Sequence, residues 1–175
     1  VRLVVYNGPA RAPVVLLNEK ITPRLGRDVA RDGVLSTRAM KQALEALARY
    51  AALLRLSGVE DVQTVATAAS RDAANGADFI DAIAGLGLRP RLLSGVEEGQ
   101  FSAVGVMAAF PGAHGIVADL GGGSLELVRI ERNTLGQAIS LPFGTLRLPE
   151  MRADGAEAFA KAVRKGLKAQ AWSTG

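Results

Sequence analysis

The sequence predicts an α/β fold in which strands and helices alternate, and two observations support this prediction. Segments rich in β-branched residues alternate with segments whose apolar residues recur every three or four positions, and the strand pattern restarts after Pro111–Gly112. Hydrophobic residues make up 49% and charged residues 22% of the 175 residues, so the composition is that of a globular protein and not of a disordered one.

The first predicted elements are two paired strands. Val1–Tyr6 and Pro13–Asn18 are apolar segments that contain β-branched residues, and Asn7–Gly8 between them has the chemistry of a turn. The chain begins inside the first strand and without Met, so we expect it to be a fragment of a longer protein.

A long helix is predicted next, from Ser36 as N-cap to about Leu56. Gly58 is expected to end it in a left-handed conformation. One apolar stripe runs along this helix at helical spacing, formed by Met40, Leu44, Leu47, Ala51 and Leu54.

Strands and helices then alternate as far as residue 112. The predicted segments are a strand at Val62–Ala66, a helix at Ala73–Ile83, a strand at Leu88–Leu93 and a helix at Glu97–Phe110. Pro90 indicates an edge or irregular strand, because proline has no amide hydrogen to donate to a neighbouring strand.

The remaining residues repeat the order of the opening. The predicted segments are strands at Gly115–Leu120, Leu125–Ile130 and Gln137–Leu141 and a helix from about Asp154 to Ala171. A hairpin, a loop and a helix follow one another in Val1–Gly26 and again in Ser124–Leu148, which suggests an internal duplication. We therefore predict two domains, residues 1–112 and 113–175.

Composition excludes several classes of site. The chain has no Cys and one His, which rules out disulfide scaffolds, zinc ribbons, iron–sulfur sites and two-His metal sites. The net charge of +4 is spread along the chain, which favours tolerance of anionic ligands over binding to DNA. The longest uncharged stretch, Gly99–Ala118, is interrupted by Pro111–Gly112, and the N-terminus lacks signal-peptide character, so we expect a cytoplasmic protein without membrane contact.

The strongest local signal is the segment ADLGGGSLEL at residues 118–127. Asp119 ends a strand, three glycines and Ser124 form a turn, and Glu126 lies in the following strand. Glycines let backbone amides converge on one point, which suits a phosphate group, and a carboxylate beside them suits Mg²⁺. A tight hairpin with ordinary turn chemistry is the structural alternative.

The second signal, SGVEEG at residues 94–99, places two adjacent acids at the start of a helix. The helix dipole alone is a sufficient structural reason for acids at this position. Glu98 shares an apolar side of the helix with Phe101 and Gly105, so we expect Glu98 to lean inward and Glu97 to face water. A carboxylate that leans into a cleft can act as a general base.

The third signal is ATAASRDAANG at residues 66–76. Arg71 is predicted in the first turn of a helix, where its charge opposes the dipole and a nearby anion would offset that cost. An ion pair with Asp72 or Asp78 is the structural alternative.

Three weaker features receive structural interpretations. His114 is expected to be a solvated loop residue, and Trp172 an anchor for structure outside this chain. A solvated basic face is predicted for Lys161, Arg164, Lys165 and Lys168.

With these three motifs in order, the chain resembles the exopolyphosphatase and guanosine pentaphosphate phosphatase family. That family carries a Thr/Ala-rich strand end with Arg and Asn-Gly, then Ser-Gly-x-Glu-Glu-Ala, then Asp-Ile-Gly-Gly-Gly-Ser-Thr-Glu-Leu. The last motif alone is shared with sugar kinases, actin and chaperone ATPases, but the three together are far more specific. The similarity extends to the segment LSTRAMKQALEAL at residues 35–47.

The resemblance implies duplicated ribonuclease-H-like domains of the actin-like ATPase superfamily, with mixed sheets flanked by helices and a cleft between the domains. It implies a hydrolase that releases terminal phosphate from inorganic polyphosphate, with Mg²⁺ as cofactor. By position, Glu98 would activate water and Arg71 would grip the terminal phosphates. Asp119 and Glu126 would lie near the metal and the attacking water, with Asp119 as metal ligand. The phosphate loop would consist of Gly121, Gly122, Gly123 and Ser124.

The chain departs from the family pattern at three places. The first phosphate loop, Asp-x-Gly-Ser-Asn-Ser, is absent; Leu125 replaces the usual Thr; and Gly99–Gln100 stands where Ala-Arg is common. Turnover by this polypeptide alone is therefore left open.

Three alternative functions are also left open. The first is the same chemistry on guanosine pentaphosphate. The second is an ATP-using sugar kinase or actin-like ATPase, which SGVEEG and the upstream Arg disfavour. The third is a non-catalytic polyphosphate or nucleotide sensor. A homodimer is compatible with each of these functions.

Overall fold

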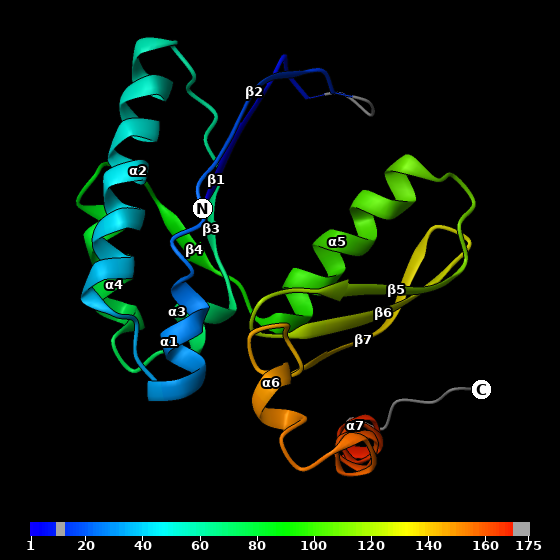
Figure 1. Ribbon diagram of the computed structural model, residues 1–175. Coiled ribbons are helices and arrows are strands. Elements are labelled where there is room, and N and C mark those ends of the chain that lie inside the picture. Colours follow the sequence, from blue (N-terminus) through cyan, green and yellow to red (C-terminus); the bar gives the residue numbers. More distant parts are fainter. Residues whose placement is uncertain (10–12, 170–175) are drawn as a thin grey trace. The chain divides into compact units, whose positions relative to one another are not determined.

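The computed structural model describes residues 1–9 and 13–169 (Figure 1). Its contacts divide the chain into two compact units, Val1–Leu92 and Leu93–Gly175. Each unit is described by itself below. In the described ranges, no helix combines the length and the apolar character needed to cross a bilayer.

The first unit contains two pairs of strands. β1 (Arg2–Tyr6) and β2 (Val15–Lys20) are antiparallel, whereas β3 (Thr64–Ala66) and β4 (Pro90–Leu92) are parallel. Each pair forms its own two-stranded sheet. All four strands agree with the predictions, and Pro90 stands at the first position of its strand, where a missing amide hydrogen is tolerated.

The helices of the first unit are α1 (Leu25–Asp32), α2 (Thr37–Leu56), α3 (Ala68–Asp72) and α4 (Gly76–Ala84). The predicted caps of α2 are confirmed: the Ser36 hydroxyl accepts a hydrogen bond from the amide of Ala39, and Gly58 has a left-handed φ of 64°. Two short helices replace the single one predicted at 73–83, because the backbone at Ala73 is extended.

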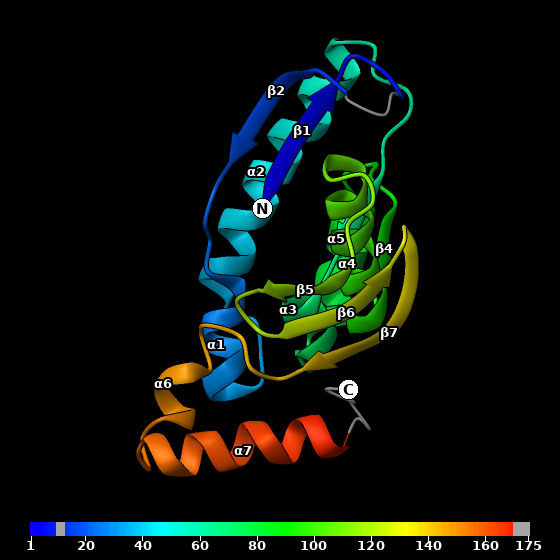
Figure 2. The same cartoon turned by 90° about the vertical axis from the view of Figure 1, so that its right-hand side faces the viewer.

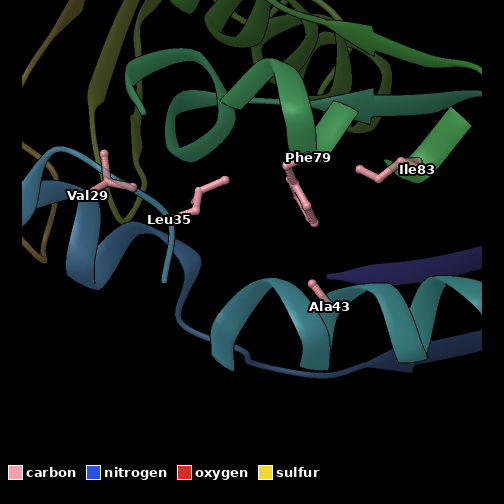
Figure 3. Close-up of a cluster of buried hydrophobic side chains, with 5 residues drawn as sticks. All are labelled: Val29, Leu35, Ala43, Phe79 and Ile83. Atoms are coloured by element: carbon pink, nitrogen blue, oxygen red, sulfur yellow. The ribbon is translucent and has the colours of Figure 1, made fainter. Parts of the chain in front are cut away.

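The core of the first unit lies between α1, α2 and α4. Its buried residues are Val29, Leu35, Ala43, Phe79 and Ile83, and Figure 3 shows Phe79 pointing toward Ala43. The most buried line of α2 is Ala39, Ala43, Ala46, Tyr50 and Leu54, so the predicted stripe is wrong by about one position along most of its length. Small alanines allow the larger side chains of α4 to approach the helix, and Met40, Leu44 and Leu47 pack at the margin.

The second unit is a three-stranded antiparallel sheet with helices. Its elements are α5 (Gly95–Ala109), β5 (Gly115–Leu120), β6 (Leu125–Glu131), β7 (Thr134–Leu141), α6 (Leu148–Met151) and α7 (Ala156–Ala169). The strand order is β5-β6-β7. Arg132 and Asn133 have φ values of 47° and 65°, as a two-residue turn between antiparallel strands requires.

Helices cover both faces of this sheet (Figures 1 and 2). Val128 and Ile130 of β6 pack with Ala103 of α5 on one face. The alternate residues Leu125 and Leu127 belong to the core on the other face, which includes side chains of α6 and α7. The predicted strands are confirmed, whereas α6 was not predicted.

The two compact units divide between Leu92 and Leu93. The helix α5, which the sequence assigns to the first domain, packs on the sheet of the second unit. The domain boundary predicted between residues 112 and 113 stays a prediction. The predicted duplication stays a prediction. Trp172 and the predicted end of the last helix lie outside the described residues.

Candidate functional site

A row of polar side chains crosses the second sheet at the end that carries the glycine turn. Asp119 on β5 is the register partner of Glu126 on β6, and Glu126 is the partner of Ser140 on β7. The Ser140 hydroxyl donates a hydrogen bond to Glu126 Oε1 at 2.7 Å. We call Asp119, Glu126 and Ser140 the polar row.

The polar row faces the first turns of α5. A Cβ added at Gly95 would lie 2.2 Å from Ser140 Oγ, and one added at Gly99 would lie 2.9 Å from the Cβ of Glu126. Glycine therefore stands where the helix backbone approaches the row too closely for a side chain.

Glu126 is buried, with only 1% of its surface exposed. Burial of a carboxylate is costly unless hydrogen-bond donors or positive charge compensate it. Here the Ser140 hydroxyl is one donor. The first turn of α5 lies close by, with Gly95 beside Glu126 Oε1, and the positive end of a helix dipole favours an anion.

The two adjacent acids of α5 have different environments. Glu97 completes a capping box: its carboxylate accepts from the Ser94 amide at 2.8 Å, and its own amide donates to Ser94 Oγ at 3.2 Å. Glu97 is thus partly buried at a cap, whereas the sequence predicted that it faces water. Glu98 is also partly buried, and its Oε2 is shielded from solvent.

The predicted apolar side of α5 is wrong. Phe101 is 55% exposed, and the buried face runs through Gly95, Gly99 and Ala103. Small residues form this face because the helix lies so close to the sheet. Glu98 adjoins that face at its edge, one helical turn before Ser102.

Ser102 is a site residue that the sequence reasoning missed. Its hydroxyl donates a hydrogen bond to Asp119 Oδ2. Because residues four apart share one side of a helix, Glu98 and Ser102 both lie on the side of α5 from which Asp119 is reached. The spacing of four after Glu98 is the signal that could have identified Ser102.

The glycine turn closes on itself through the Gly121 amide, which donates to the Ser124 carbonyl at 2.9 Å. Within the described part of the chain, the amides of Gly122 and Gly123 donate to no protein acceptor. These two amides are the backbone donors that a phosphate group could use. None of the three glycines has a positive φ. A Cβ added at Gly121 would make an ordinary contact with the Ser124 carbonyl oxygen at 3.4 Å, and one at Gly122 would lie 3.3 Å from the Leu146 side chain.

The loop after β7 supports the glycine turn, which the sequence analysis did not predict. The Thr145 and Leu146 amides donate to the Gly121 and Gly122 carbonyls, each at 2.9 Å. A Cβ at Gly144 would lie 2.3 Å from the Gly122 carbonyl oxygen. The conformation of the turn therefore depends on Gly144.

Arg71 belongs to the first unit and lies in the last turn of α3, not in the first turn of a helix as predicted. Its Nε is 3.4 Å from Asp72 Oδ1, which is one of the two ion pairs named as the structural alternative.

Two neighbouring residues of the same motif have structural roles. Asn75 exchanges hydrogen bonds with the Leu35 backbone at 2.8 and 3.0 Å, and Gly76 lies against the Ser70 carbonyl.

The described residues contain no group of three or more His, Asp or Glu side chains that could hold a metal ion. Mg²⁺ does not require such a group, since it commonly binds one or two carboxylates together with water and substrate phosphates. Asp119, beside the glycine turn, fits this mode, because the Ser102 hydroxyl bonds only one of its two carboxylate oxygens.

His114 is exposed, as the sequence analysis predicted. The predicted basic face is exposed as well, at Lys161, Arg164, Lys165 and Lys168.

Comparison with known proteins gives consistent matches. The profile of the Ppx/GppA phosphatase family matches residues 4–169. Exopolyphosphatase 2 of Mycobacterium tuberculosis is 35% identical over 136 residues, which are 73% of this chain and 42% of that protein. Exopolyphosphatase 1 of Mycobacterium leprae is 30% identical over 139 residues, 78% of this chain and 41% of that protein.

Solved structures agree in fold. An exopolyphosphatase from Cytophaga hutchinsonii has a TM-score of 0.84 at 26% identity, covering 95% of this chain and 56% of that one. The Aquifex aeolicus member of the Ppx/GppA family has a TM-score of 0.73 at 27% identity, covering 94% and 54%. The predicted ribonuclease-H-like α/β class is confirmed. The chain spans less than half the length of these curated relatives.

Proposed function

Because the chain belongs to the Ppx/GppA phosphatase family, we propose that this protein hydrolyses the terminal phosphoanhydride bond of inorganic polyphosphate. The observation that carries the proposal is the polar row beside the glycine turn. The first turns of α5, which contain Glu98, pack against this row through Gly95 and Gly99. Both relatives described above are exopolyphosphatases and share 30% or more of their aligned residues with this chain.

In the proposed reaction Glu98 orients a water molecule and takes its proton as that water attacks the terminal phosphorus. The bond to the bridging oxygen then breaks, and the shortened polyphosphate leaves. The partial burial of Glu98 supports this role, since a carboxylate that is partly withdrawn from water can act as a general base. The amides of Gly122 and Gly123 would hold phosphate oxygens, and Arg71 would add positive charge.

Asp119 would hold Mg²⁺ together with oxygens of the substrate. When bound, Mg²⁺ supplies positive charge that neutralises the phosphate oxygens. Glu126 is assigned a supporting role at the same place, because its buried carboxylate adjoins Asp119 and the start of α5. A cytoplasmic location, a homodimer and guanosine pentaphosphate as a second substrate stay predictions.

The decisive experiment is phosphate release from polyphosphate by the full-length protein. We expect release that depends on Mg²⁺, stops with EDTA and transfers no phosphate to added glucose or glycerol. Transfer to a sugar would favour a kinase of the actin-like class. Binding of polyphosphate with no release would favour a sensor. Competition with guanosine pentaphosphate would rank the two substrates.

A further inference from the structure

We propose that Ser102 is a positioning residue for Asp119, and that it determines how strongly Asp119 holds a divalent metal ion. The inference rests on the proposed function and adds to it a residue that none of the three sequence motifs contributes. Ser102 lies on α5, and its hydroxyl donates to Asp119 Oδ2.

The need for such a donor follows from the register of the sheet. Asp119 and Glu126 are direct cross-strand partners, and like charges at directly opposite positions repel each other. Each carboxylate has its own serine donor: Ser140 bonds Glu126 Oε1, and Ser102 bonds Asp119 Oδ2. Each of the two carboxylates is therefore held by a hydroxyl of its own.

The hydrogen bond also selects which oxygen of Asp119 is used for metal binding. The Ser102 hydroxyl takes one lone pair of Oδ2, which favours Oδ1 as the atom that binds a metal ion. Hydrogen bonds from a second residue to a ligating carboxylate commonly change metal affinity by about 10- to 100-fold. Ser102 follows Glu98 by one turn, so the same helix carries the proposed base and the group that orients the metal ligand.

The test measures metal binding directly, with Mn²⁺ as a probe that prefers the same oxygen ligands as Mg²⁺. Mn²⁺ is titrated into the 175-residue chain while its broadening of amide NMR signals at residues 119–124 is followed. Free Mn²⁺ is measured in parallel by electron paramagnetic resonance, which gives the Kd.

We expect Ser102→Ala to raise the Kd for Mn²⁺ by about 10-fold and Ser102→Thr, which keeps the hydroxyl, to restore it within about 2-fold. Val104→Ala is the matched control, since Val104 lies on the same helix and its side chain is exposed, at 47%. Its Kd should equal that of the wild type. Asp119→Asn should abolish broadening at these amides.

An unchanged Kd in Ser102→Ala, with amide shifts showing a folded chain, would overturn the inference. So would a Ser102→Thr variant as weak as Ser102→Ala, or a wild-type chain that shows no broadening near Asp119. None of these results bears on hydrolysis, which the phosphate-release experiment tests separately. A purely structural role for Ser102 would change the stability of α5 but leave the Kd unchanged.

Discussion

At the scale of single residues, the chain places two adjacent carboxylates in different roles. Glu97 is bonded to the Ser94 amide and hydroxyl and thereby caps α5. Glu98 is not part of that cap and adjoins the buried face of the helix beside the row. An acid already bonded to two donors is poorly suited to accept a proton from water, so the capping box supports the proposal that Glu98, and not Glu97, is the base.

The first prediction is that Glu98→Gln in the full-length protein lowers kcat for polyphosphate by about 10²- to 10⁴-fold with little change in KM. The amide keeps the shape of the side chain but cannot take a proton. Glu97→Gln is the control, because Gln also serves in a capping box, and it should retain most of the activity. Near-normal kcat in the Glu98 variant would show that another group activates water.

A second prediction concerns Asn75, whose side chain bonds both the amide and the carbonyl of Leu35. Asn75→Ala leaves two backbone groups without these partners, at a cost of about 1–3 kcal/mol in the free energy of unfolding. Urea denaturation of the isolated chain would measure the loss. A variant as stable as the wild type would mean that water replaces both bonds.

At the scale of elements, α5 approaches the sheet closely because its buried face is made of small residues. A Cβ at Gly99 would lie 2.9 Å from Glu126 Cβ and 3.0 Å from Val128 Cγ2. Gly105, on the same helix, has no heavy atom within 4 Å of such a Cβ. A comparison of alanine substitutions at Gly99 and Gly105 therefore separates the effect of helix propensity on stability from the effect of packing.

We predict that Gly99→Ala lowers the free energy of unfolding by about 1–3 kcal/mol, because the new methyl group overpacks the interface. Gly105→Ala should raise it by up to about 1 kcal/mol, since alanine is the better helix former. Denaturant titration of both variants checks the contrast. Equal effects at the two positions would contradict the close packing of α5.

α3 and α4 give a parallel case in the first unit. A Cβ at Gly76 would lie within 1.9 Å of the Ser70 carbonyl oxygen, whereas one at Gly85 would make an ordinary contact at 3.4 Å. We predict that Gly76→Ala lowers the thermal midpoint of unfolding clearly and that Gly85→Ala changes it little. A calorimetric scan of the two variants would test this, and similar midpoints would contradict the close approach of the helices.

At the scale of the whole molecule, the predicted site residues are divided between the two compact units. Arg71 comes from the first unit, whereas the polar row, Glu98 and the glycine turn all come from the second. Arg71 is the proposed contribution of the first unit to the reaction.

We predict that Arg71→Ala in the full-length protein raises KM for polyphosphate and lowers kcat together, because the guanidinium would contact both substrate and transition state. Arg55→Ala, at an exposed position in the last turn of α2, is the control and should leave both values unchanged. An unchanged KM in the Arg71 variant would restrict this residue to its ion pair with Asp72.

Much of the fold follows from the sequence by itself. The strands of both units, the caps of α2 and the glycine turn were predictable because they depend on neighbouring residues: β-branched runs, a serine before a helix, and glycines between strands. The three motifs at residues 66–76, 94–99 and 118–127 likewise indicated the family, because their order along the chain is a property of sequence alone.

Tertiary structure alone decided which residues meet. No local pattern indicates that α5 packs on the later sheet or that the loop at Gly144 supports the glycine turn. The spacing of Ser102 after Glu98 places the two on one side of a helix but does not indicate that Ser102 bonds Asp119. These contacts join residues at least 17 positions apart, and they depend on strand register and on how closely two backbones approach. The sequence alone therefore named Glu98, Asp119 and Glu126, but packing decided that Glu126 is buried and that a serine bonds each carboxylate of the row.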